Sequence, residues 1–234
     1  MRTTCLSRVA GCAVGITLMC VGAGRAAIYN PTTDFSVTQS QNVNGVWSYG
    51  YENASFGNFQ LMNYNEPASG TPLGWRVLQY QDSGNIWVNT ATYSQYGVSP
   101  GQLSLHPNED GTPTVLRWTA PSAGSFTING QFLAGDGGTP DIAVLVNGTK
   151  VWTGNNAGSF NLNGSIAAGG DIDFAVYFDS SVRNWYNDNT PLVATVNFSP
   201  VPEPTTMVAG VGAIGMVLAG MARSRRSSVA RIGK

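Results

Sequence analysis

The chain has 234 residues, of which 42% are hydrophobic and 11% are charged, and its formal net charge is −1. This length is enough for one domain with a proper core. Residues 28–199 hold four basic and twelve acidic side chains, so the net charge of this part is near −8. This negative charge disfavours nucleic acid as a partner. All three cysteines (Cys5, Cys12 and Cys20) lie in the first 27 residues, which excludes disulfides and cysteine metal sites from the remainder.

The first 27 residues have the pattern of a secretory signal peptide. Two arginines precede an uncharged apolar stretch at 9–21, and small residues at 24–27 suit cleavage. We expect this segment to direct export and to be removed, so that the mature chain starts near Ala27 or Ile28. A lipid anchor at Cys20 is the alternative, but the residues before it lack the small side chains that such a site needs.

Residues 28–199 show the alternation of apolar and polar residues that is typical of strands, without a long helical periodicity. The alternation is clearest at 126–132 and 172–178. Further strands are expected at Val46–Tyr51, Phe59–Tyr64, Trp75–Tyr80, Ile86–Asn89, Leu103–Leu105, Val115–Thr119, Ile142–Val146, Lys150–Thr153, Ser159–Leu162 and Val193–Phe198. Many short strands separated by Gly, Asn, Ser and Pro predict an all-β, antiparallel β-sandwich or jelly roll, with an up-and-down barrel as the alternative.

The strongest local prediction is a hairpin at Asn147-Gly148. Both residues tolerate the positive φ of a type I′ turn, and strand-like segments lie on either side of them.

One part of this region carries a resemblance. The segments Val115–Pro121, Ala123–Phe126, Gly130–Phe132 and Val144–Gly148 are similar to the strand and turn signatures of jelly-roll modules in secreted bacterial proteins, including carbohydrate-binding ones. The resemblance covers about a third of residues 28–199 and bears on the fold far more than on a ligand.

Signatures of an enzyme are sparse. Residues 28–199 have no cysteine and one histidine, and they contain no nucleophile elbow or phosphate loop. His106 could act as a general base with Glu109 as its orienting partner, but a histidine before a proline at a strand end is more often a turn residue bonded to backbone. We therefore expect a protein that is not an enzyme.

A calcium site is a further hypothesis, because calcium needs only clustered oxygen ligands. Asp136 and Asp141 bracket a glycine-rich loop, and Asp179 and Asp188 fall in later loops. Asp beside Gly is also the ordinary composition of a turn, and the sequence has no calcium-loop motif.

Tryptophans are the candidate glycan-binding residues, since aromatic faces can stack on sugar rings while amides bond to hydroxyls. Trp185 with Tyr186, and separately Trp47, have polar and aromatic neighbours and are our candidates. Core packing is the competing interpretation for any one tryptophan, and it is favoured for Trp118, which shares a strand with Leu116.

The C-terminal 34 residues combine a short motif, an apolar span and a basic end. Val201, Pro202, Glu203 and Pro204 precede the uncharged stretch 205–222, and Arg223, Arg225 and Arg226 follow it. A helix of 18 residues is about 27 Å long, slightly short of a hydrocarbon core of about 30 Å. Because basic flanks stay on the cytoplasmic side, we expect the domain to face outwards.

This tail closely resembles the PEP-CTERM sorting signal of Gram-negative bacteria. The resemblance implies cleavage near Pro202-Glu203-Pro204 by an exosortase after export by the secretion machinery, with transient anchoring in the inner membrane. The domain would then reach the cell surface or the extracellular matrix. The sequence thus predicts an exported β-sandwich with extracellular polysaccharide as its candidate ligand. A purely structural or adhesive matrix protein and a glycan-active hydrolase are the alternatives.

Overall fold

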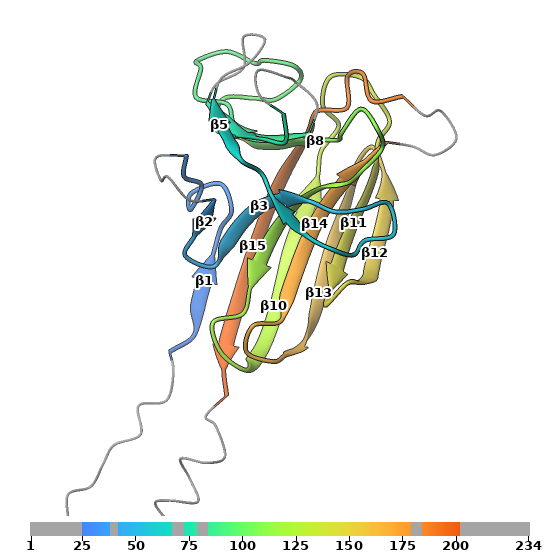
Figure 1. Cartoon of the computed structure of the whole chain (residues 1–234). Coiled ribbons are helices and arrows are strands. Elements are labelled where there is room, and N and C mark those ends of the chain that lie inside the picture. Colours follow the sequence, from blue (N-terminus) through green and yellow to red (C-terminus); the bar gives the residue numbers. More distant parts are fainter. Residues whose placement is uncertain (1–24, 38–41, 67–72, 79–83, 179–183, 202–234) are drawn as a thin grey trace, which may run out of the picture. The chain divides into compact units, whose positions relative to one another are not determined.

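The computed structural model describes residues 25–37, 42–66, 73–78, 84–178 and 184–201. These residues form strands, turns and loops and contain no helix. The strands make two antiparallel sheets, here called sheet A and sheet B, that pack against each other (Figure 1). The expected β-sandwich is confirmed, and the two open sheets replace the closed barrel that was its alternative.

Sheet A contains the longest strands. Its order is β13 (Gly158–Ile166), β10 (Gly124–Phe132), β15 (Thr190–Pro200), β8 (Leu103–His106), β7 (Asn85–Val88), β6 (Gly74–Arg76) and β5 (Tyr64–Glu66), and β1 (Ala27–Tyr29) also pairs with β15. The β10 strand pairs with both neighbours over its whole length without a register shift.

Sheet B is built from shorter strands. Its order is β12 (Thr149–Asn155), β11 (Asp141–Val146), β14 (Asp171–Tyr177), β9 (Thr114–Thr119), β3 (Trp47–Tyr51) and β2 (Val43–Asn44), and β4 (Gln60–Leu61) also pairs with β3. The predicted hairpin joins β11 to β12: Val146 pairs with Thr149, and Asn147 and Gly148 have φ values of 49° and 72°. The prediction of a two-residue turn with positive φ is confirmed.

Three parts of the strand pattern differ from expectation. The strand expected at Trp75–Tyr80 ends at Arg76, and Val77 and Leu78 form a bend. Residues 59–64 form not one strand but β4 in sheet B and β5 in sheet A, because the chain crosses between the sheets at Met62, whose side chain is buried in the core. The strands β1 and β2 were not expected, since three and two residues are too few to show an alternation.

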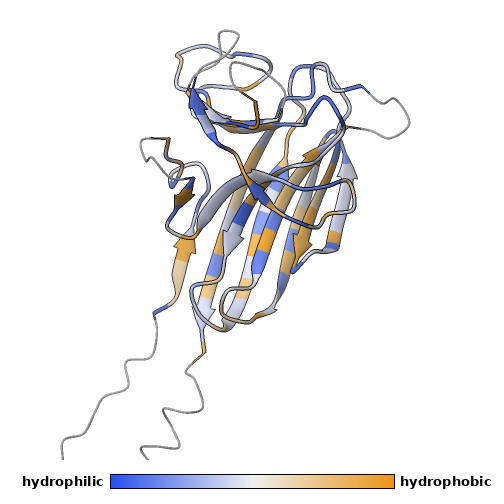
Figure 2. Ribbon diagram, in the orientation of Figure 1, coloured by the Kyte–Doolittle hydropathy of each residue, from blue (hydrophilic) through white to orange (hydrophobic). Residues whose placement is uncertain are grey.

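Hydrophobic and hydrophilic residues alternate along the long strands (Figure 2), and the hydrophobic ones contribute to the core. In β10, Phe126, Ile128 and Phe132 are buried between the sheets, whereas Ser125 and Asn129 are exposed on the outer face. Each Å² of apolar surface that is buried in such a core contributes about 25 cal/mol to the free energy of folding, and this burial is the main favourable contribution.

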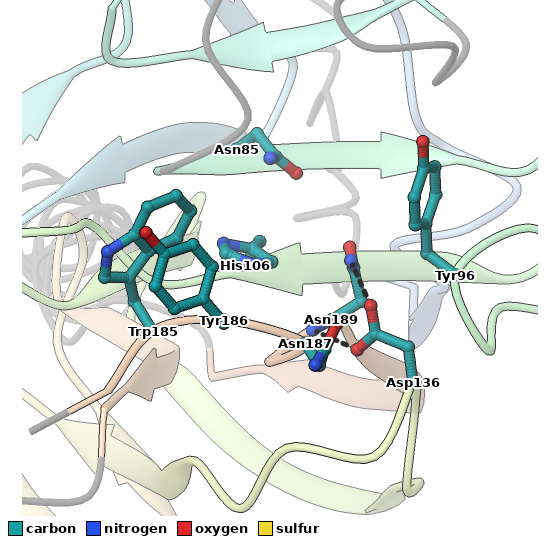
Figure 3. Close-up of a pocket in the computed structure, with 8 residues that line it drawn as sticks. All are labelled: Asn85, Tyr96, His106, Asp136, Trp185, Tyr186, Asn187 and Asn189. Carbon is teal, nitrogen blue, oxygen red and sulfur yellow. Dashed lines mark hydrogen bonds between the residues drawn. The ribbon is translucent and has the colours of Figure 1, made fainter. Parts of the chain in front are cut away.

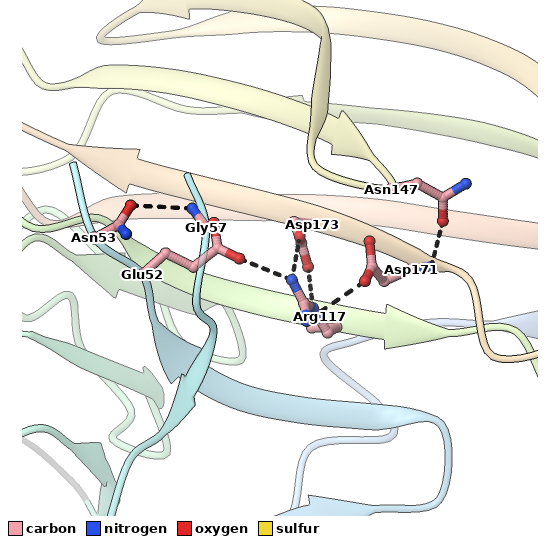
Figure 4. A network of polar contacts seen from close by, with 7 residues as sticks. All are labelled: Glu52, Asn53, Gly57, Arg117, Asn147, Asp171 and Asp173. Atoms are coloured by element: carbon pink, nitrogen blue, oxygen red, sulfur yellow. Dashed lines mark hydrogen bonds and ion pairs between the residues drawn. The ribbon is translucent and has the colours of Figure 1, made fainter. Parts of the chain in front are cut away.

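The outer face of sheet B is covered by the chain that leads from β3 to β4. Phe56 and Phe59 pack there on a small apolar cluster that includes Val115 and Leu145. Beside it lies a polar network centred on Arg117, whose guanidinium is 4.0 Å from the Phe59 ring centroid (Figure 4).

Arg117 holds three carboxylates in this network. It donates two hydrogen bonds of 2.7 Å to Asp173, which is fully buried, and one of 2.8 Å to Glu52, and it lies 3.4 Å from Asp171. Burial and the neighbouring acids raise the pKa of Glu52, while Arg117 opposes the shift. Burial likewise raises the pKa of Asp173. One cation therefore has to neutralise three acids in a poorly hydrated place.

Most of the predicted targeting signals lie outside the described residues. These include most of the signal peptide, the sorting residues Pro202, Glu203 and Pro204, the apolar span, and Arg223, Arg225 and Arg226. Val201 is described and exposed, and its N–H donates to the carbonyl of Ala123. Within the described part of the chain, no helix is long and apolar enough to cross a membrane.

Candidate functional site

A pocket with a cavity volume of about 190 Å³ lies at the end of the sandwich where β15 begins (Figure 3). It is lined by Asn85, Tyr96, His106, Asp136, Trp185, Tyr186, Asn187 and Asn189. Pockets for drug-sized ligands span roughly 300–1,000 Å³. This pocket therefore suits one ring of a larger molecule. A second hollow, lined in part by Tyr186 and Asn187, adjoins it.

Aromatic side chains form one wall of the pocket. Trp185 and Tyr186 stack with their ring centroids 4.4 Å apart, and Trp185 also meets the buried His106 ring edge-on at 5.8 Å. Trp185 is half-buried, whereas the Tyr186 side chain is 62% exposed. The pair thus has a packed inner ring, Trp185, and an outer ring, Tyr186, whose surface is open to a ligand.

Tyr96 stands across the pocket from these rings (Figure 3). Tyr96 and Gly97 have φ values of 49° and 71° and occupy the centre of a tight turn in which Gln95 and Val98 exchange two backbone hydrogen bonds. A Cβ on Gly97 would lie 2.1 Å from the carbonyl carbon of Gly135. Glycine is needed both for the positive φ and for this close approach of two loops.

Asp136 ties two of the pocket's loops together. Its carboxylate accepts hydrogen bonds of 3.1 Å from the backbone N–H and from the side-chain amide of Asn189. The amide oxygen of Asn189 in turn accepts a hydrogen bond of 3.2 Å from the indole of Trp87, which is fully buried in β7. Hydrogen bonds to a carboxylate are stronger than neutral ones, so this chain of contacts fixes the loop that carries Trp185 and Tyr186.

The lining residues have few charges. Asp136 carries the one carboxylate among the eight, and none of them is a lysine or an arginine. Three of them are asparagines, whose amides can both donate and accept hydrogen bonds. The chemistry of the pocket is therefore aromatic and amide, with a weakly acidic character.

The structure separates the candidate tryptophans. It places Trp185 and Tyr186 together in the pocket, whereas Trp47 is buried, packs against Phe174 and donates its indole N–H to Asp34. The interpretation of Trp47 as a glycan-stacking residue is therefore wrong, because β3 is covered on both faces and its polar neighbours are buried as well. Trp118 is in the core, as expected.

The two candidate calcium ligands have different hydrogen-bond partners. Asp136 binds Asn189, whereas Asp141 begins β11 and accepts a hydrogen bond of 3.2 Å from Asn155. Among the described residues, no three His, Cys, Asp or Glu side chains form a cluster that could hold a metal ion. Asp188 is buried beside the pocket, and Asp179 lies outside the described residues.

His106 contacts the backbone at the end of its strand, as expected for a turn residue rather than a general base. Its Nδ1 lies 3.0 Å from the carbonyl oxygen of Pro107, and Glu109 is exposed in the following turn. In addition, the His106 ring supports Trp185 at the back of the pocket.

Four lining residues were missed in the sequence: Asn85, Tyr96, Asn187 and Asn189. Tyr96-Gly97 could have been noticed as a turn, but nothing in the sequence indicates that it faces a loop about 40 residues away. The asparagines look like ordinary loop residues until the loops are assembled.

No protein-family model matches the chain, and no curated protein matches it in sequence. Among solved structures, it is similar to a family 35 carbohydrate binding module from Clostridium thermocellum (16% identity, TM-score 0.29, covering 49% of this chain and 85% of that one). It is also similar to a CBM35 from Cellvibrio japonicus (14% identity, TM-score 0.30, covering 52% of this chain and 87% of that one). A third similar structure is an insecticidal delta-endotoxin from Bacillus thuringiensis (14% identity, TM-score 0.29, covering 47% of this chain and 21% of that one). Likenesses of this strength leave the family and the ligand unassigned.

Proposed function

We propose that this chain is an exported, non-catalytic β-sandwich protein that binds neutral glycans in the pocket lined by Tyr96, Trp185 and Tyr186. The observation that carries the proposal is the exposed Tyr186 ring, held in place by Trp185 and surrounded by amides. Its open surface offers an apolar platform for a sugar ring, and the amides of Asn85 and Asn187 can bond to hydroxyls.

The charges of the pocket support a neutral ligand over an acidic one. Asp136 would repel a uronic acid, and none of the lining residues is a lysine or an arginine that would compensate. The same composition favours binding over hydrolysis. A retaining glycosidase uses two carboxyl groups about 5 Å apart, but Asp136 stands alone among the lining residues and is engaged by Asn189.

The pocket and the C-terminal end of the domain lie at opposite ends of β15. The pocket adjoins Thr190 at the start of β15, and the chain leaves the domain at Pro200, at the far end of the same strand. Eleven residues of strand span about 36 Å. We propose that the tail directs exosortase processing at Pro202-Glu203-Pro204.

The experiment is a glycan array with the full-length chain, followed by titration of each soluble hit. Tyr186→Ala should weaken binding about two- to tenfold, the loss expected from one aromatic contact. Tyr93→Ala is the matched control, because Tyr93 is 64% exposed, close to the 62% of Tyr186, and does not line the pocket. If the array gives no hits, or if both variants bind equally, the glycan proposal is wrong.

The structural or adhesive alternative is favoured by a different observation. The β13 strand at the margin of sheet A carries no charge and is suited to pairing with another strand. A matrix protein could use such an edge to assemble, with or without a glycan.

A further inference from the structure

The β13 strand is an unusually open edge. It pairs with β10 over nine consecutive residues without a register shift, and no other described strand pairs with its far side (Figure 1). Such a strand presents a row of backbone N–H and C=O groups to a partner.

The other sheet margins have features that discourage pairing, and β13 has none of them. The β12 strand is bulged at Val151, which has no partner in the register, and it carries Lys150. The β5 and β2 strands at the opposite margins are three and two residues long. In contrast, β13 is long and unbroken and contains no charge and no proline. Edge strands are usually protected by one of these features.

The sequence of β13 complements itself about its centre. If two copies run antiparallel with Leu162 opposite Leu162, Asn161 faces Asn163, Ser159 faces Ser165, and Phe160 faces Gly164. Polar residues face polar residues in the serine and asparagine pairs, and the large ring of Phe160 faces Gly164, which has no side chain. A two-fold interface requires this kind of reciprocity.

The sidedness of the strand agrees with this register. Ser159, Asn161, Asn163 and Ser165 are exposed on the outer face, whereas Phe160 is buried and Leu162 is half-buried against the core. When the two strands pair about Leu162, the polar side chains of both copies lie on the outer face and the apolar side chains of both copies lie on the core face.

An asparagine ladder already crosses this part of the sheet. Asn161 donates a hydrogen bond of 2.7 Å to the side-chain oxygen of Asn129 on β10. Because amides have both donors and acceptors, the Asn161–Asn163 pairs of a second copy can extend this ladder.

We propose that β13 pairs with β13 of a second copy of this chain, antiparallel and centred on Leu162, so that sheet A continues through a two-fold dimer. This interface goes beyond the proposed glycan site and uses none of the residues that line the pocket.

The test is sedimentation velocity of the full-length chain over a range of concentrations. In the Asn161→Lys/Asn163→Lys variant, two symmetric like-charge pairs would face each other, and the dissociation constant of the dimer should rise at least about tenfold. In the Asn161→Lys/Asn163→Glu variant, each lysine would face a glutamate, and dimerisation should return. Thr195→Lys on β15, a half-buried position inside sheet A, is the control and should dimerise like the wild type.

Three outcomes would overturn the proposal: a wild-type chain that stays monomeric at all concentrations, a double-lysine variant that still dimerises, or a Lys/Glu variant that does not recover. Circular dichroism of each variant shows whether it is folded. Glycan titration of the same variants reports on the pocket, so failure of the dimer and failure of the proposed function are distinguishable.

Discussion

Replacing Arg117 with leucine tests the energetics of the covered face of sheet B. Arg117 makes two hydrogen bonds to Asp173, whose side chain is fully buried, and one to Glu52. Without the guanidinium, these acids and Asp171 would face one another with no cation. Breaking a buried ion pair by removing one partner costs about 3–5 kcal/mol. Because Arg117 is 18% exposed, water can reach part of the site, and we expect a cost near the lower value.

The assay is thermal unfolding followed by circular dichroism at pH 7 and pH 5. A cost of about 3 kcal/mol corresponds to a fall of about 6–12 °C in melting temperature for a domain of this size. Lys150→Leu is the control: its ammonium lies over the rings of Phe56 and Tyr177, and losing that contact should cost about 1 kcal/mol.

The pH dependence sharpens the test. The pKa values of Glu52 and Asp173 are already raised, so these acids take up protons more readily than in the unfolded chain, and the loss of Arg117 should raise both further. The cost of Arg117→Leu should therefore shrink at pH 5. An effect no larger than that of Lys150→Leu, or one that grows towards pH 5, would refute the reasoning.

Three further predictions concern the same network, the loops and the tail. The folded-state pKa of Glu52 is raised, so the stabilisation that comes from protonating Glu52 is fully present below its unfolded pKa of about 4.3 and is lost as the pH rises through its folded pKa. The melting temperature of Glu52→Gln should therefore fall less than that of the wild type between pH 5 and pH 7. Asp136→Ala should weaken glycan binding because it removes the two hydrogen bonds that hold Asn189, and the binding of the wild type should not require calcium. A calcium requirement in the wild type would contradict the role of Asp136 as a partner of Asn189. Alanines at Pro202, Glu203 and Pro204 should leave 223–234 attached in cells that contain an exosortase, and intact-mass analysis of the wild type showing the same attachment would count against processing.

The fold was largely predictable because strand alternation is local. The strands at 126–132 and 172–178 follow from alternating residues alone, and Asn147-Gly148 marks its turn by residue type. The crossing at Met62 was not predictable, because it depends on how far apart the sheets lie.

The site was predictable only in part. Trp185 and Tyr186 could be named because a polar loop around two aromatic rings suggests exposure. Trp47 has similar neighbours, but its side chain lies in the core between the two sheets, where it packs against Phe174. Tyr96 and Asn189 join the pocket through contacts between loops far apart in the chain, which no local pattern contains.

The most direct test of the central claim is a crystal structure of the chain with a soluble neutral oligosaccharide chosen from the glycan array. The account predicts a sugar ring stacked on Tyr186, with its hydroxyls bonded to the amides of the pocket. A sugar bound elsewhere on the sandwich, with the Tyr186 ring left in solvent, would contradict it.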